Sequence, residues 1–381
     1  LQMKKRSHCI YYSRLLFSCS HEKGMVFKSN KGEHMLKENF GTTPDGEKVS
    51  LYTLKNNRGA SISVSDFGAL LVRVCVPDRE ETLRDVVLGY DDIDEYISGS
   101  GCFGAVIGRC GNRTANARFQ LNGITYHLTQ NENGNNLHSG PDSYDKRMWT
   151  VSEAADQEVS FELISPDKDQ GFPGCLKLTV TYSLTDDNCV KIHYQGICDQ
   201  DTVVNMTNHS YFNLNGADSG TTVEDHLLKI YADTYTPVAD SSSIPTGEII
   251  SVRGTPFDFT ERKQIGQDIR AKSDQLRYTG GYDHNFILRQ GEGIREMAEA
   301  FSEKSGIRML AYTDCPAVQF YTGNSIGNKK GKRGAVYKDL SGFCLESQYC
   351  PNAVNTPAFL SPVVKAGDRY DSLTAYKFET V

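Results

Sequence analysis

The chain has 381 residues, of which 38% are hydrophobic and 23% charged, a balance that excludes a disordered or collagen-like protein. A chain of this length buries about three quarters of its unfolded surface and needs neither disulfides nor a metal to hold its core. The 41 basic and 48 acidic residues give a net charge of −7, and there is no broad basic stripe, so we expect neither nucleic acid nor membrane as a partner.

Residues 1–35 come before the first strand pattern and differ from the rest of the chain. They are basic, poor in acidic residues and show no regular alternation. We expect a basic leader or an extension that is not part of the fold, with a transit peptide as the open alternative. Ser13 and Arg14 interrupt the apolar stretch at 10–17, which is too short to span a bilayer.

Short strand patterns recur from residue 36 to residue 381, and turn residues separate them. Asn122-Gly123 is typical of a two-residue hairpin turn. Hardly any helical periodicity lies between the strands, so we predict one all-β domain over 36–381, a large antiparallel β-sandwich with few short helices. The predicted strand segments are 61–77 with a break at 66–68, 118–128, 175–197 with a turn at 186–188, 296–313 with a turn at 304–306, 317–323, 342–348 and 372–380. The best helix candidate is 260–276, with Thr260 as its cap and Gly266 as an interruption.

The eleven cysteines are scattered and include no Cys-x-x-Cys pair, which indicates free thiols in a reducing compartment. Glycosylation sequons start at Asn112, Asn205 and Asn208, inside the stretches that we predict to be catalytic. A glycan there would block the site. We therefore expect a cytoplasmic protein.

Two glycine-containing motifs have simpler explanations than nucleotide binding. GSGCFG at 99–104 matches G-x-G-x-x-G, but no buried strand precedes it and no helix pattern follows, so we expect a close-packed loop. GNKKGKRG at 327–334 is the one dense basic run. No Ser or Thr follows its Gly-Lys pair, so it is not a Walker loop, and we expect a solvated loop.

Polar side chains stand inside apolar strand sequence at five places. Any one of them could be a satisfied core group, but together they provide an acid, a base and hydroxyl-binding groups. Glu346 and Gln348 are two residues apart and share one face of a strand. The five groups, in chain order, are Asn112 with Arg113, His138, Asn208 with His209, Asp283 with His284, and Glu346 with Gln348.

The same inventory lacks the signs of nucleophilic or metal chemistry. Ser210 follows His209 directly, but neighbours on a strand point to opposite faces. Neither Gly-x-Ser-x-Gly nor His-Glu-x-x-His occurs, so we expect no metal and no cofactor. One carboxylate and one imidazole favour proton shuttling on a sugar, and isomerisation over hydrolysis, which normally uses two carboxylates.

The stretches GAVIGRCGNR, NLHSG, TNHSYFNLNG, GGYDHNFIL, VQFYTGN and ESQYCPNAVN resemble the galactose mutarotase (aldose 1-epimerase) family over residues 40–380. The resemblance implies a β-sandwich isomerase that interconverts the α and β anomers of a hexose, D-galactose and also D-glucose, as a monomer or weak homodimer. It implies Glu346 as general base, His209 as general acid, and a cleft shaped by Trp149. The implied substrate-binding residues are Asn112, Arg113, His138, Asp283 and Gln319.

The ordinary pKa values of the two side chains, about 4.3 for Glu and 6.5 for His, agree with these roles. They predict an anionic Glu346 and a readily protonated His209 near neutral pH. Two alternatives stay open. A phosphosugar 1-epimerase on the same fold would need further cationic groups at the cleft. A carbohydrate-binding β-sandwich without catalysis would need no aligned Glu–His pair.

Overall fold

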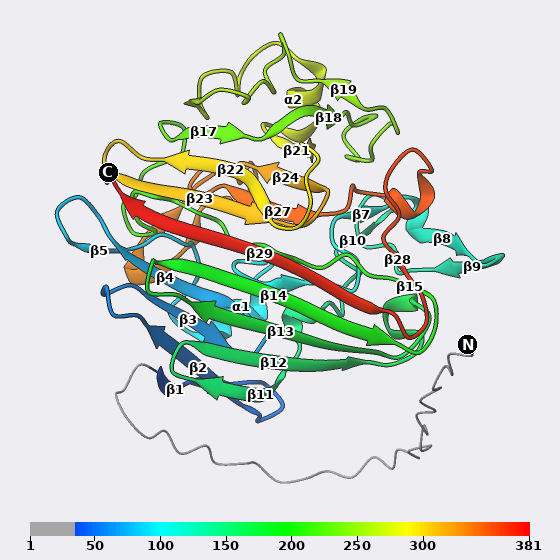
Figure 1. Cartoon of the computed structure of the whole chain (residues 1–381), viewed down its shortest axis with the longest axis horizontal. Helices are drawn as coiled ribbons and strands as arrows, with labels where there is room; N and C mark the ends of the chain where they lie inside the picture. The colour runs from blue at the N-terminus through cyan, green and yellow to red at the C-terminus, as the bar shows by residue number, and fades with distance from the viewer. Residues whose placement is uncertain (1–34) are drawn as a thin grey trace, which may run out of the picture. The chain divides into compact units, whose positions relative to one another are not determined.

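Antiparallel strands are the main regular structure of residues 35–381, the part of the chain that the computed structural model describes (Figure 1). A nine-stranded sheet forms one layer, and its long strands run across the view in Figure 1. Its side chains alternate: Leu176, Leu178 and Val180 point into the core, while Lys177 and Thr179 face outward. The strands, in spatial order, are β11 (Thr150–Ala155), β12 (Glu158–Ser165), β13 (Leu176–Leu184), β14 (Cys189–Cys198), β29 (Arg369–Thr380), β23 (Ile307–Thr313), β22 (Arg295–Phe301), β17 (Leu227–Ile230) and β20 (Lys263–Gln264).

Two five-stranded sheets contribute to the same core. Ile62 of the first sheet and Phe286 of the second join one hydrophobic cluster with Leu178. The Tyr376 hydroxyl on β29 donates to the Leu345 carbonyl on β27 at 2.9 Å, which ties the layers together. The first sheet is β1 (Met35–Thr42), β2 (Lys48–Lys55), β3 (Ser61–Ser65), β4 (Leu71–Pro77) and β5 (Leu83–Asp85). The second is β19 (Ile250–Ser251), β18 (Ala232–Thr236), β21 (Asp283–Leu288), β24 (Ala317–Tyr321) and β27 (Cys344–Gln348). The predicted antiparallel β-sandwich is confirmed.

Short elements connect these layers. Five two-stranded pairs join β6 (Val106–Ile107) to β16 (Thr207–Asn208), β7 (Arg113–Thr114) to β10 (Asn136–Leu137), β8 (Arg118–Leu121) to β9 (Ile124–His127), β15 (Thr202–Val203) to β28 (Val363–Val364), and β25 (Lys329–Lys330) to β26 (Val336–Tyr337). The two α-helices of the described residues are α1 (Ile93–Ser98) and α2 (Asp274–Thr279), with 3₁₀ turns at Ala115–Ala117, Tyr144–Lys146, Asp169–Gly171, Lys332–Gly334 and Ala353–Asn355. No helix among residues 35–381 is long and apolar enough to cross a bilayer.

The predicted hairpins form where the turn residues place them, at 122–123, 186–188 and 304–306. The predicted helix over 260–276 is wrong except for its last residues, which begin α2. Thr260 bonds to the Asp258 carboxylate instead of capping a helix, and Lys263 pairs with Leu228 in a sheet. A Cβ at Gly266 would lie 2.8 Å from Glu224, so this stretch packs as a close-fitting loop.

Two other regions differ from the sequence predictions. Helix α1 was not predicted; the Asp92 side chain caps it by accepting from the Glu95 N–H. The basic run at 327–334 is only partly solvated, because Lys332 is 2% exposed and its ammonium donates to Asp85 and to the Val87 carbonyl, both at 2.7 Å. The predicted leader lies outside the described residues, and β1 begins at Met35, one residue before the predicted boundary.

Candidate active site

The floor of the site is the cleft-facing side of β27. Alternation places Cys344, Glu346 and Gln348 on this side, while Leu345 enters the main core on the other. On the neighbouring strand β24, Gln319 lies directly opposite Glu346. One strand further, Asp283 begins β21. Pairing of three strands therefore gathers polar groups that are far apart in the sequence.

His209 reaches this floor from the end of β16. The loop before β6 holds its backbone, because the His209 N–H donates to the Ala105 carbonyl at 2.8 Å and the Gly104 N–H donates to the His209 carbonyl at 3.0 Å. Gly104 has a φ of 68°, and a Cβ there would lie 2.1 Å from the Leu71 carbonyl oxygen. The GSGCFG motif is thus the close-packed loop that the sequence predicted, and it positions His209.

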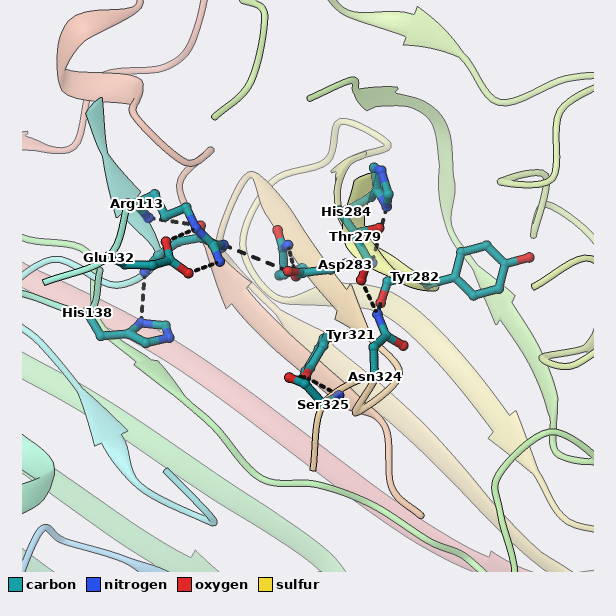
Figure 2. Close-up of polar contacts among 12 residues, drawn as sticks. Arg113, Glu132, His138, Thr279, Tyr282, Asp283, His284, Tyr321, Asn324 and Ser325 are labelled. Carbon is teal, nitrogen blue, oxygen red and sulfur yellow. Dashed lines mark hydrogen bonds and ion pairs between the residues drawn. The ribbon is translucent and has the colours of Figure 1, made fainter. Parts of the chain in front are cut away.

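The opposite wall comes from the ends of β7 and β10. The His138 N–H donates to the Asn112 carbonyl at 3.0 Å, and the Asn112 N–H donates back to His138 Nδ1 at 3.1 Å. Both residues have positive φ, 52° and 58°, which non-glycine residues adopt rarely. This reciprocal pair fixes both the position and the rotation of the imidazole (Figure 2).

These walls enclose a cleft of about 470 Å³, within the usual size range of small-molecule sites. Six of the seven predicted site residues line it: Asn112, Arg113, His138, His209, Asp283 and Glu346. The rest of the lining is mostly polar or aromatic, namely Ser100, Gly101, Cys102, Glu132, Leu137, Tyr211, Ser241, Ser243, Tyr278, Thr279, Gly280, Tyr321, Asn324 and Ser325.

Gln319 and Trp149 do not line the cleft. The Gln319 amide donates to Asp283 at 2.6 Å and accepts from Gln348 at 3.2 Å, so Gln319 holds the Asp283 carboxylate from behind. Its predicted contact with a sugar hydroxyl stays a prediction. Trp149 is 3% exposed in the main core, where its indole N–H donates to the Tyr144 carbonyl, so it does not shape the cleft directly.

Sequence reasoning missed Glu132, which holds Arg113 in place. The Glu132 carboxylate accepts from Arg113 Nε at 2.6 Å and from Nη2 at 2.7 Å, a bidentate pair. Arg113 Nη1 then faces Asp283 Oδ2 at 3.8 Å, too far for a direct hydrogen bond (Figure 2). One hydroxyl placed between these two atoms could accept from Arg113 Nη1 and donate to Asp283 Oδ2. Glu132 lies in a short Asn/Gly-rich loop, and only the register of β10 brings it to Arg113.

The two predicted catalytic groups meet at the base of the cleft. His209 Nε2 lies 3.7 Å from Glu346 Oε1, and the two side chains are 8% and 3% exposed. The imidazole stacks on the Tyr211 ring with centroids 4.9 Å apart. No group among residues 35–381 donates a hydrogen bond to Glu346 Oε2. This oxygen is itself buried, so no hydrogen bond stabilises the charged form of the carboxyl there.

Burial reverses the protonation states that the sequence predicted for this pair. Burial raises the pKa of Glu346 to about 8, with repulsion from Asp283 adding to the rise and Arg113 opposing it. Burial also lowers the pKa of His209 to about 4. At neutral pH this order of pKa values leaves a protonated Glu346 carboxyl and a neutral His209 imidazole. Glu346 and His209 together still share one exchangeable proton, but it resides on the glutamate instead of making the histidine an imidazolium.

His138 differs from His209 in what it can do with a proton. Its Nδ1 already accepts from the Asn112 N–H, so the single proton of the neutral ring must sit on Nε2. Burial, with His209 and Arg113 nearby, holds the pKa of His138 well below its ordinary value. His138 is therefore a neutral hydrogen-bond donor with a fixed tautomer.

This tautomer also bears on metal binding. Ligand atoms of His138, His209 and Glu346 lie within 4.8 Å of one another, a two-histidine, one-carboxylate set. A ligating histidine normally donates its other ring N–H to an acceptor. At His138 the other nitrogen instead receives a hydrogen bond, so Nε2 has no free lone pair for a metal. The group fits a hydroxyl-bearing ligand better than an ion.

The lining also bears on the two alternatives. Among the described residues that line the cleft, Arg113 is the only lysine or arginine, and Glu132 already neutralises it. A phosphate dianion would find no further cation there. A carbohydrate-binding module without catalysis would not need a buried Glu346–His209 pair in which one carboxyl oxygen has no hydrogen bond.

Comparisons with known proteins bear on the same site. The sequence profile of the aldose 1-epimerase family matches residues 50–377. Aldose 1-epimerase of Escherichia coli strain K12 is 41% identical over 347 residues, 90% of this chain and 99% of the relative. Galactose mutarotase of Homo sapiens is 40% identical over 341 residues, 89% and 97% of the two chains. A solved aldose epimerase homologue from C. elegans superposes with a TM-score of 0.79 at 31% identity, over 87% of this chain and 99% of its own.

Proposed function

The chain belongs to the aldose 1-epimerase family, and on that premise we propose that it interconverts the α and β anomers of D-galactose and D-glucose, with Glu346 and His209 as its acid–base pair. The observation that carries the proposal is the 3.7 Å separation of His209 Nε2 and Glu346 Oε1 at the base of a polar cleft of about 470 Å³. Two proton-transfer groups on one side of a hexose-sized space suit a reaction on two oxygens of one carbon.

The proposed reaction opens and recloses the sugar ring. Glu346 takes the proton of the anomeric hydroxyl while the bond from the anomeric carbon to the ring oxygen breaks, and His209 protonates that oxygen. The open-chain aldehyde turns about the bond between its first two carbons. The ring then closes on the other face, with the His209 imidazole as base and the Glu346 carboxyl as acid.

The protonation states that burial favours at Glu346 and His209 are compatible with these roles. A protonated Glu346 beside a neutral His209 holds the same single proton as an anionic Glu346 beside an imidazolium. Glu346 lines the cleft, and a sugar hydroxyl that donates a hydrogen bond to its carboxylate would stabilise the charged form. We infer that substrate binding shifts the proton from Glu346 to His209, so the pH dependence follows the pair as a whole.

The remaining polar groups would hold the sugar. A hydroxyl between Arg113 Nη1 and Asp283 Oδ2 accepts from the one and donates to the other. His138 Nε2–H donates to a sugar oxygen near the reacting carbon, and its fixed tautomer prevents it from serving as the imidazolium acid. Asn112 orients His138, and Gln319 orients Asp283.

We further propose a cytoplasmic monomer or weak homodimer. None of the nine cysteines among residues 35–381 is in a disulfide. The three sequon asparagines are 2–4% exposed, so a glycan could not be accommodated on the folded protein.

Polarimetry tests the proposed function directly. Freshly dissolved α-D-galactose, α-D-glucose and α-D-glucose 6-phosphate are compared with and without enzyme, and with the Glu346→Gln variant as control. We expect the enzyme to accelerate mutarotation of the two neutral sugars and the Glu346→Gln variant to give no comparable acceleration. Prolonged dialysis against a chelator should leave the rate of the wild-type enzyme unchanged. A preference for the phosphorylated sugar, or activity that a divalent ion restores after chelation, would contradict the proposal.

A further inference from the structure

The side of His209 that faces away from Glu346 has a thiol as its neighbour. Cys344 Sγ lies 3.4 Å from His209 Nδ1, within hydrogen-bonding distance for sulfur. Cys344 is fully buried and sits two residues before Glu346 on β27, so both side chains point to the same face of the strand. One strand thus contacts both ends of the imidazole, with the carboxyl towards Nε2 and the thiol at Nδ1.

A general acid of this kind needs a partner at its second nitrogen. When the imidazolium gives up its Nε2 proton, the neutral ring that remains carries its proton on Nδ1. That N–H is buried and needs an acceptor, because a buried donor without a hydrogen bond keeps the full cost of its lost hydration. Among the side chains of the described residues, the hydrogen-bond partner of His209 Nδ1 is Cys344 Sγ.

Resting on the function proposed above, we propose that Cys344 is a positioning residue: its sulfur accepts the Nδ1–H of His209 and holds the imidazole in the tautomer that has Nε2 free for the sugar ring oxygen. Its sulfur does not touch substrate. It acts by fixing the rotation and the tautomer of His209.

A thiol serves this purpose differently from the carboxylate or carbonyl that usually holds an active-site histidine. Sulfur in a neutral thiol is a weak acceptor and carries no charge, so it orients the ring without stabilising the imidazolium. Burial, with the negative charges of Glu346 and Asp283, holds the pKa of the Cys344 thiol well above its ordinary value, so it stays neutral. An imidazolium that is not stabilised is a stronger acid, which suits a weakly basic ether oxygen.

The other side chains around His209 supply no competing partner for Nδ1, although a hydrogen bond with the residue's own backbone raises the pKa of the ring against the effect of burial. Tyr211 covers the face of the ring, and His138 and Tyr321 meet it edge-on with centroids 5.4 and 6.3 Å away. The titratable groups that face His209 are Glu346 and Cys344 on β27, Tyr321 on β24, His138 after β10 and Tyr211 in its own segment, and Cys102 lines the same cleft.

The test compares Cys344→Ala and Cys344→Ser with Cys315→Ala, which removes another buried thiol whose sulfur contacts Ser372 and not the site. We expect Cys344→Ala to lower kcat about tenfold with KM unchanged, in the range seen when a supporting partner of an active-site histidine is lost. Serine should restore most of kcat and move the acid limb of the kcat/KM profile to higher pH, because a hydroxyl is the stronger acceptor. Cys315→Ala should change neither.

Nitrogen chemical shifts of His209 in ¹⁵N-histidine-labelled protein provide a readout without turnover. We expect a protonated Nδ1 and an unprotonated Nε2 in the wild type at neutral pH, and a mixture of tautomers in Cys344→Ala. An Nε2–H tautomer in the wild type would overturn the proposal, even if the variants failed to fold. So would a Cys344→Ala enzyme with wild-type kcat and shifts. A wild type that does not act on galactose or glucose would instead overturn the proposed function.

Discussion

Two buried pairs of a carboxyl and a basic side chain, Asp85 with Lys332 and Glu346 with His209, differ in how completely their hydrogen bonds are made. In the first pair, Asp85 accepts from the Lys332 ammonium at 2.7 Å and from the Val74 N–H at 3.1 Å. The ammonium also donates to the Val87 carbonyl at 2.7 Å. In the second pair, Glu346 and His209 stand 3.7 Å apart and one carboxyl oxygen has no partner in the described chain.

The comparison distinguishes a pair that supports the fold, Asp85 with Lys332, from a pair suited to proton transfer, Glu346 with His209. Burial imposes a desolvation cost on both, but the first offsets it with short charge-assisted hydrogen bonds. The second lacks such bonds, and burial there raises the pKa of Glu346 and lowers that of His209. In the first pair burial also lowers the pKa of Lys332, but the Asp85 carboxylate and its hydrogen bond oppose that shift. We therefore expect substitutions in the first pair to change stability and substitutions in the second to change turnover.

The largest effect on turnover should come from Glu346→Gln. The amide keeps the shape of the carboxyl but cannot exchange a proton, so kcat should fall by at least about 10²-fold, the usual scale for a general acid or base. The urea midpoint should not fall, since no bond to the carboxyl is lost. Glu299→Gln, at a buried glutamate that pairs with Arg262, is the matched control and should keep its kcat. A variant that turns over like wild type would remove Glu346 from the mechanism.

The opposite outcome is expected for Lys332→Met. Removing the ammonium leaves Asp85 buried without its cation, which should lower the free energy of unfolding by about 3–5 kcal/mol. The folded fraction should keep its kcat, because Lys332 does not line the cleft. Urea unfolding and active-site-normalised rates measure the two quantities. An unchanged free energy of unfolding would show that the Lys332–Asp85 pair does not stabilise the fold, and the contrast with Glu346 and His209 would be wrong.

The two histidines of the cleft should differ from each other. His209→Asn should lower kcat by about 10²-fold or more, because the ring oxygen leaves poorly without a proton. His138→Asn should cost less and mainly raise KM, because its fixed Nε2–H binds but does not transfer a proton. Steady-state rates on galactose decide between them. An inactive His138→Asn enzyme beside an active His209→Asn enzyme would make His138 the general acid and His209 the binding residue.

Much of the fold could be predicted from local signals. Alternation and turn residues such as Asn122-Gly123 depend on neighbours in the sequence, and those hairpins form as predicted. The wrong helix at 260–276 and the missed helix α1 are short segments for which a single side-chain cap or a close approach to Glu224 decides the outcome. Such contacts depend on tertiary packing, which the sequence pattern does not contain.

In the candidate site, too, local signals could be predicted from the sequence and tertiary contacts could not. Six of the seven predicted site residues line the cleft; the family resemblance assigned them, and the polar groups within apolar strand sequence point to the same six. Glu132 was missed because it stands in an ordinary polar loop. The protonation of Glu346 was predicted wrongly because ordinary pKa values assume exposure to water. Burial is a property of the packed structure, and it also explains why Lys332 differs from the lysines around it.

The pH dependence of kcat/KM for the wild type tests the shared proton of Glu346 and His209 most directly, because this ratio reports the free enzyme. A lowered histidine pKa and a raised glutamate pKa leave the pair with one proton between about pH 4 and about pH 8. We predict a plateau over this range, with the acid limb from protonation of His209 and the alkaline limb from ionisation of Glu346. An alkaline midpoint near 6.5, where an ordinary imidazole loses its proton, would contradict the account.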